Sequence, residues 1–155
     1  MSGHEYPPLA EVLPHRGRMI LLSRVLAHSG TRTVCAVAID HDGPFVQAAG
    51  TVPAWIGIEY MAQCVAAHAG LRAHARGEPP RIGFLVGARR VDFRTAGFRV
   101  GQPLTVHASH IWGDRESAAF ACGVVDGESD DVLVEATLTV YQPATLEPFL
   151  RAAST

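Results

Sequence analysis

The feature that most limits how this chain can fold is a long apolar segment in its first half, TVPAWIGIEYMAQCVAAHAG, residues 51–70. Glu59 is its only charged residue, and Pro53 suits the first turn of a helix, where its missing N–H costs nothing. The pair Pro79-Pro80 forbids continuation of the helix. The segment therefore predicts one helix from Pro53 to about Arg76. Because this helix is apolar nearly all round, a sheet, or a sheet together with a partner, must cover it.

Six further segments have the composition of strands, and short turns separate most of them. Strands joined by short turns form an antiparallel sheet. The order along the chain is two strands, the long helix and four more strands, which predicts an α+β fold. The expected strands are residues 19–28, 31–39, about 82–93, 102–112, 116–125 and 131–141.

Length and composition indicate one globular domain over residues 1–155. The hydrophobic fraction of 48% and the charged fraction of 18% suit a chain that buries a core. No apolar run reaches the about 18 residues that cross a bilayer, and the start MSGHEYPPLAEV lacks the pattern of a signal peptide. Cys35, Cys64 and Cys122 are widely spaced and form no CxxC pair, which suits reduced thiols. We therefore expect a cytoplasmic protein.

Glu59 is the strongest candidate for a catalytic residue. A carboxylate among apolar side chains is costly unless it is paired, lies at a cleft or takes part in chemistry. Gln63 lies four residues further on the same helix face, and the helix start near Ala54 offers backbone N–H groups that can hold a carbonyl oxygen as it gains negative charge. These groups predict a site for thioester chemistry. The alternatives are a structural ion pair of Glu59 with an arginine such as Arg89 or Arg90, or a buried hydrogen bond to Gln63.

Motifs for other chemistries are absent from the sequence. There is no HExxH or CxxC spacing, and His107 and His110 lie on opposite faces of a predicted strand, so we expect no metal site. The chain has no GxSxG elbow and no GxGxxG or GxxxxGK phosphate loop. We therefore expect neither a serine hydrolase nor a bound cofactor.

Positive charge is concentrated in one part of the chain. All 13 basic residues are arginine, and seven of them lie between Arg72 and Arg99, where Glu78 and Asp92 are the only acids. One interpretation is a solvated face whose charge is balanced elsewhere in the molecule. The other is a docking surface for an acidic partner. Nucleic acid is disfavoured because the net charge of the chain is −2.

Three segments resemble, in order and spacing, one known family. LPHRGRMILLSRVL (13–26) is similar to its N-terminal segment, VPAWIGIEYMAQ (52–63) to its central helix, and RIGFLVGARRVDFRTAGFRVGQPLTV (81–106) to the strand and turns that follow. The family is that of hotdog-fold 3-hydroxyacyl-[acyl carrier protein] dehydratases, and the second segment most resembles the predicted dehydratase subgroup of aryl polyene biosynthesis clusters. The resemblance covers about residues 12–142. It implies a single hotdog domain, a sheet wrapped around one helix, assembled at least as a dimer.

The resemblance also implies roles for single residues. Glu59 matches the acid that protonates the departing hydroxyl, Gln63 its supporting amide, and Ala54 the backbone N–H that holds the thioester carbonyl. The family's base is a histidine in a loop motif His-Phe-Pro-Gly. The aligned loop here, PFVQAAGTV, contains no histidine. His15 and His41 are the candidates to replace that base.

The substrate that the resemblance implies is an acyl thioester on acyl carrier protein. Trp55 is then expected to line an acyl tunnel, with core packing as an equal explanation, and Arg89, Arg90 and Arg94 to meet the carrier's acidic surface. Three functions stay open. The first is a dehydratase of fatty acid or aryl polyene biosynthesis that is active by itself. The second is a catalytically incomplete subunit paired with a histidine-bearing hotdog partner, and the third is a thioesterase in which Glu59 activates water.

Overall fold

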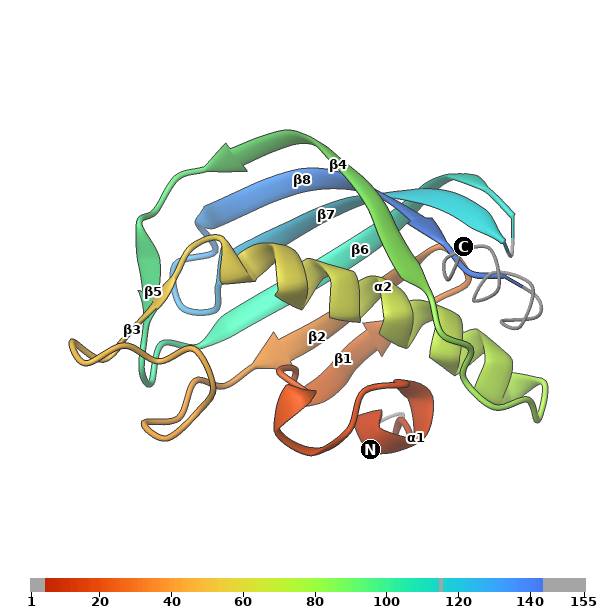
Figure 1. The fold of residues 1–155 in the computed structure, drawn as a ribbon, viewed down its shortest axis with the longest axis horizontal. Coiled ribbons are helices and arrows are strands. Elements are labelled where there is room, and N and C mark those ends of the chain that lie inside the picture. Colours follow the sequence, from red (N-terminus) through yellow and green to blue (C-terminus); the bar gives the residue numbers. More distant parts are fainter. Residues whose placement is uncertain (1–4, 115, 144–155) are drawn as a thin grey trace, which may run out of the picture.

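One long helix lies across a curved, six-stranded antiparallel sheet (Figure 1). The computed structural model describes residues 5–114 and 116–143. The helix, α2, spans Ile56–Ala75, and the strands follow the order β1-β2-β6-β7-β8-β4 across the sheet. The α+β architecture predicted from the sequence, with a sheet wrapped around one long helix, is confirmed. No helix in the described ranges is long and apolar enough to cross a membrane.

The six strands of the sheet are those that the sequence predicts, with shifted ends. The first strand begins later than expected, because residues 17–19 form a short 3-10 helix, η1 (Gly17–Met19), ahead of it. Every neighbouring pair in the sheet is antiparallel. The strands are β1 (Arg24–His28), β2 (Arg32–Val37), β4 (Phe84–Phe93), β6 (Leu104–Gly113), β7 (Ser117–Asp126) and β8 (Val132–Tyr141).

A second, two-stranded sheet was not predicted. It pairs β3 (Thr51–Pro53) with β5 (Gly97–Arg99), and the short helix α1 (Leu9–Val12) was missed as well. The predicted helix start at Pro53 is therefore wrong by three residues, because this proline ends a short strand instead. Proline is tolerated in such an edge strand, where its missing N–H breaks no interior hydrogen bond.

Two layers of the structure cover helix α2, and this allows a helix that is apolar nearly all round to be stable. On one side it meets the sheet: a side chain added at Gly57 would lie 3.3 Å from the ring of Phe98 and 3.4 Å from Val134. On another side it meets the segment before β1. A Cβ at Gly70 would lie only 1.8 Å from the carbonyl oxygen of Val12, so the close approach of these two segments requires glycine.

Candidate active site

One stripe of α2 is left uncovered by both layers. Glu59, Ala62, Ala66 and Ala69 are only half-buried, and they recur every three or four residues, so they lie along one side of the helix. The small side chains of the three alanines leave space between α2 and the sheet. These residues line a cavity of about 400 Å³ together with residues of β4, β6, β7 and β8, a size that suits a small-molecule ligand.

The position of this stripe corrects the predicted helix faces. The helical spacing predicts that the face of Glu59 and Gln63 continues through Ala66, Ala67 and Gly70, and that Ala62 and Ala69, on the other side, pack against the sheet. In the structure, Gln63, Ala67 and Gly70 are buried, with Gln63 and Gly70 against the segment before β1. Ala62 and Ala69 take their place beside Glu59 and face the cavity. The cavity therefore runs from Glu59 along the helix toward its C-terminal end.

The walls of the cavity are mostly apolar, with charged side chains of both signs among them. The bases are Arg72 and Arg76, from the last turns of α2, and Arg81, just before β4; the acids, besides Glu59, are Asp114 and Glu116, from the turn between β6 and β7. In the view of Figure 1, β4 crosses over the C-terminal half of α2. Residues of both elements line the cavity. The apolar lining includes Val65, Phe84, Leu85, Ala118, Phe120 and Val140.

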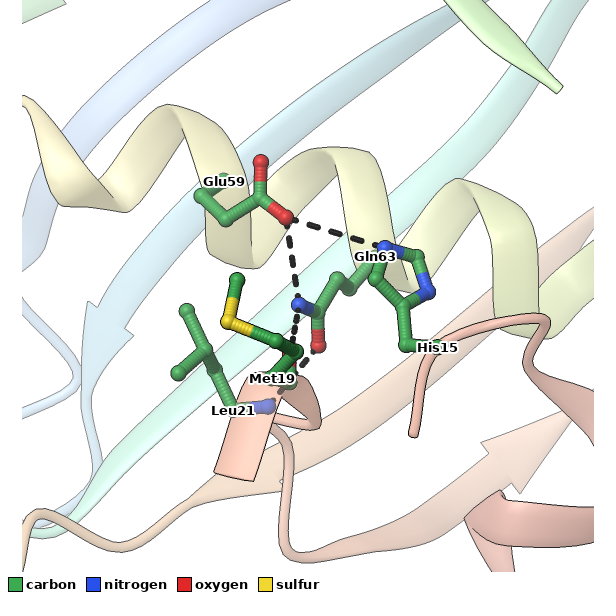
Figure 2. Close-up of polar contacts among 5 residues, drawn as sticks. All are labelled: His15, Met19, Leu21, Glu59 and Gln63. Carbon is green, nitrogen blue, oxygen red and sulfur yellow. Dashed lines mark hydrogen bonds and ion pairs between the residues drawn. The ribbon is translucent and has the colours of Figure 1, made fainter. Parts of the chain in front are cut away.

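The Glu59 carboxylate lies at the cavity wall and is held by its neighbours (Figure 2). Its side chain is 41% exposed, so the carboxylate is more accessible than its apolar sequence neighbours suggested. Oε1 accepts a hydrogen bond of 3.1 Å from Nε2 of Gln63. In the described parts of the chain, no group donates a hydrogen bond to Oε2. One oxygen of Glu59 is thus fixed, while the other is available to a ligand.

Gln63 is fully buried, and hydrogen bonds fix both ends of its side-chain amide. Nε2 donates to the carbonyl oxygen of Met19 at 2.7 Å as well as to Glu59, and Oε1 accepts from the N–H of Leu21 at 2.9 Å. The two backbone partners fix which end of the amide points to Glu59, because a reversed amide would face a carbonyl with an oxygen. The Nε2 donor of Gln63, and not its Oε1 acceptor, therefore lies next to the Glu59 carboxylate.

Of the two predicted histidines, only His15 reaches the site. Its Nε2 lies 3.8 Å from Oε1 of Glu59, within ion-pair range when His15 is protonated but too long for a hydrogen bond. Its Nδ1 is buried and has no partner among the described residues. His41 is exposed in the loop between β2 and β3 and does not line the cavity.

The start of α2 does not offer the predicted amide. The N–H of Ala54 donates to the carbonyl oxygen of Ala96 at 3.1 Å, so the prediction that it is free to hold a thioester carbonyl is wrong in this structure. Within the described residues the unpaired N–H groups at the helix start are those of Trp55 and Ile56. The Trp55 side chain is 63% exposed and does not line the cavity, so neither the tunnel nor the core explanation fits it.

The three arginines predicted to meet a carrier differ in their surroundings. Arg94 donates hydrogen bonds of 2.9 Å to Asp92 and to Glu135, and the hydrogen bond to Asp92 contributes most to raising the pKa of Arg94. Arg89 and Arg90 lie exposed on β4, and neither forms an ion pair with a described acid. The alternative that either one forms a structural ion pair with Glu59 is therefore wrong.

His68 is a polar residue of the cavity that its sequence position does not predict. It lies nine residues beyond Glu59, two and a half turns along the helix, and this spacing predicts that it faces away from Glu59. It nevertheless lines the same cavity, together with Arg72 of α2, His110 of β6 and Phe120 of β7. No spacing pattern signals this, since it depends on where β4 crosses the helix.

The chain and its fold have counterparts among known proteins. The model of the ApeP-like family, described as ApeP dehydratase, matches residues 7–151. The structure of the dehydratase heterocomplex ApeI:P from Xenorhabdus doucetiae is similar with a TM-score of 0.87 and 30% sequence identity, over 96% of this chain and 99% of that chain. No curated protein compared with the chain matches it.

More distant structures share the fold alone. A hypothetical thioesterase with coenzyme A from Streptococcus pneumoniae TIGR4 has a TM-score of 0.58 and 12% identity, over 77% of this chain and 84% of that one. Thioesterase superfamily member 2 of zebra fish has a TM-score of 0.61 and 11% identity, over 86% and 89%. The family model, in contrast, spans nearly the whole chain, which therefore belongs to the ApeP-like family of hotdog-fold dehydratases.

Proposed function

We propose that the chain is one subunit of a dehydratase that removes water from a 3-hydroxyacyl thioester held on acyl carrier protein, in fatty acid or aryl polyene biosynthesis. One observation carries the proposal: the Glu59 carboxylate lies at the wall of a largely apolar cavity, with one oxygen fixed by Gln63 and the other open. An apolar cavity suits an acyl chain, and a positioned carboxyl group suits proton transfer at its reacting carbons.

The reaction needs two proton transfers at neighbouring carbons. A base takes a proton from C2, the electron pair of that C–H bond forms the C2=C3 double bond, and the C3–O bond breaks. An acid gives its proton to the departing hydroxyl, which leaves as water. We assign the acid to Glu59, whose fixed carboxylate presents one oxygen to the cavity.

This chain lacks the histidine that would serve as the base. The loop that resembles the family's histidine motif, PFVQAAGTV, has no histidine. His15 is the described histidine nearest to Glu59, and it lies 3.8 Å from the same oxygen that Gln63 holds. The similar structure from Xenorhabdus doucetiae is a heterocomplex of dehydratase subunits, which supports a hotdog partner that brings the missing base.

The edge strand β4 supports a partner as well. It ends the six-stranded sheet, is ten residues long and has no strand on its outer side among the described residues. Leu85, Val86, Val91 and Phe93 are exposed along it, with Val86 at 60%. A long edge strand with exposed apolar side chains is prone to pair with another chain, so we propose that the partner subunit packs against β4.

Arg89 and Arg90, also on β4, are our candidates for contact with the acidic carrier. Arg94 is less suited, because Asp92 and Glu135 already balance its charge. Charge attraction of this kind speeds association and weakens with salt. Replacing Arg89 and Arg90 by glutamine should therefore raise KM for a carrier-bound substrate and flatten its salt dependence, and leave KM for a short, carrier-free thioester unchanged.

The test is turnover of a 3-hydroxyacyl carrier thioester, followed by mass spectrometry for the loss of water. The purified chain is assayed alone and mixed with the hotdog protein proposed as its partner. Glu59→Gln should lower the rate about a hundredfold or more, as expected for loss of a general acid, whereas the exposed control Glu11→Gln should not change it. An unchanged rate in Glu59→Gln contradicts the assignment. Release of free thiol without loss of water would favour the thioesterase.

A further inference from the structure

His68 is a buried polar side chain in the wall of the cavity, and the proposed reaction does not use it. The side chain is 2% exposed. Its Nδ1 lies 2.8 Å from the hydroxyl oxygen of Thr33, on β2, which is a hydrogen bond. Its Nε2 is buried and has no hydrogen-bond partner among the described residues. An unpaired buried nitrogen is costly, and native structures contain few of them.

The hydrogen bond between Thr33 and Nδ1 of His68 allows Nε2 to be either protonated or unprotonated. The Thr33 hydroxyl also lies 2.8 Å from Nδ1 of His28, and it has only one proton to share between the two rings. Burial, followed by the charges of His28, Arg72 and His110, lowers the pKa of His68 to about 4, against a smaller raising effect of the nearby Gly30 backbone, so the ring is neutral at neutral pH. Turning the Thr33 hydroxyl from one ring to the other selects the tautomer of His68. Its Nε2 is thus either a donor or an acceptor.

Aromatic rings pack around His68, and Arg72 is the charged side chain near it in the cavity wall. The ring of Phe120 packs edge-on against it, with centroids 5.6 Å apart, and His110 packs against the other part of Phe120 at 5.5 Å. His68 lies nine residues from Glu59 on α2, which places the two about 13 Å apart along the helix axis. A ligand that fills the cavity from Glu59 onward therefore passes His68 at that depth.

We propose that His68 is a specificity residue whose Nε2 forms a hydrogen bond with a polar group of the bound thioester, a hydroxyl, carbonyl or amide about 13 Å from the carbons that react. The proposal rests on the proposed function, because it takes the cavity as the thioester site. Two parts of such a substrate carry these groups: the far end of the acyl chain and the pantetheine arm. The small ring movement that exposes Nε2 is common when ligands bind.

The experiment measures binding, so that it does not depend on turnover. Acyl pantetheine thioesters without the 3-hydroxyl are titrated into the protein by calorimetry, in two matched pairs. The first pair has chains of equal length that end in a hydroxyl or in a methyl group. The second pair has one acyl group on the full pantetheine arm or on the shorter N-acetylcysteamine. We expect the protein to prefer the polar member of one pair about tenfold or more.

Two substitutions separate the nitrogens of the ring. The amide of His68→Asn replaces Nδ1 and keeps a partner for Thr33, so it should abolish the preference. The longer His68→Gln carries its amide near the position of Nε2 and should retain most of it. His74→Asn, exposed on the same helix and outside the cavity, should behave like the original chain. Thermal unfolding of each variant shows whether it folds.

The outcomes show which part of the thioester carries the polar group, and they separate the role of His68 from the proposed function. Preference within the first pair places the polar group in the acyl chain, and preference within the second places it in the pantetheine arm. Equal binding within both pairs, or a preference that survives in His68→Asn, overturns the role of His68. If the preference holds but no 3-hydroxyacyl thioester loses water in the turnover assay, the proposed function fails while the binding role of His68 stands.

Discussion

Acid should destabilise this fold through His68. The free imidazole has a pKa of about 6.5, and burial lowers the pKa of His68 in the folded chain to about 4. Below pH 6.5 the unfolded chain therefore binds a proton at this residue that the folded chain does not bind. The free energy of unfolding falls as the pH drops from 6.5 toward 4, and the loss from this group levels off below that.

The size of the loss follows from these two pKa values. At pH 5 most unfolded chains carry the proton and few folded chains do, so the free energy of unfolding is lower by about 2 kcal/mol than at pH 7.5. The low exposure of His68, 2%, means that water screens little of this effect. His28 and His107 add to the loss, since burial is also the largest cause that lowers their pKa values.

The assay is urea unfolding at pH 7.5 and pH 5, at one protein concentration, for the original chain and for His68→Gln. Because glutamine does not titrate in this range, the variant should lose about 2 kcal/mol less on acidification than the original chain. His74→Gln, at an exposed position of the same helix, should show the full loss. Equal losses in the original chain and in His68→Gln would refute the burial of a neutral imidazole at this site.

Three further substitutions test the packing, the amide and the edge strand. Gly70→Ala should lower the free energy of unfolding in urea by about 1–3 kcal/mol, because the new Cβ collides with the carbonyl of Val12; unchanged stability would contradict that contact. Gln63→Met leaves backbone groups at Met19 and Leu21 unpaired and should cost about 1–3 kcal/mol in the same assay. It should also lower kcat more than it raises KM, and an effect on stability alone would assign Gln63 a purely structural role. Val86→Lys should shift the assembly toward monomer in sedimentation experiments, and unfolding of the monomer should change by no more than about 0.5 kcal/mol. A full-size assembly in Val86→Lys would rule out β4 as the contact.

The elements that the sequence predicts well are those with strong local patterns. The long apolar run of α2 and the β-branched strands between short turns are visible within each segment. The strand β3 is not, because Thr51–Pro53 is three residues long and its partner, Gly97–Arg99, lies far along the chain. Pro53 suits the first turn of a helix and the end of an edge strand equally, so local preference alone misplaced the helix start.

The candidate site shows the same division between local and long-range information. Glu59 and Gln63 stand out because a charge and an amide interrupt an apolar helix. The sequence does not reveal which stripe of that helix stays open, since this depends on where distant segments pack. The segment before β1 covers Gln63 and Gly70, which leaves Ala62 and Ala69 for the cavity. For the same reason the carboxylate of Glu59 is half-exposed and not buried.

The geometry around Glu59 also limits what this chain does in the proposed reaction. Gln63 occupies one carboxylate oxygen, so a single oxygen remains to exchange a proton with the substrate. Once Glu59 has given its proton to the departing hydroxyl it is a carboxylate, and a protonated His15 at 3.8 Å would stabilise that charge. In that role His15 already carries a proton and is unable to take another from C2. We therefore propose that the group that takes the C2 proton comes from a second subunit, delivered at the open edge of β4.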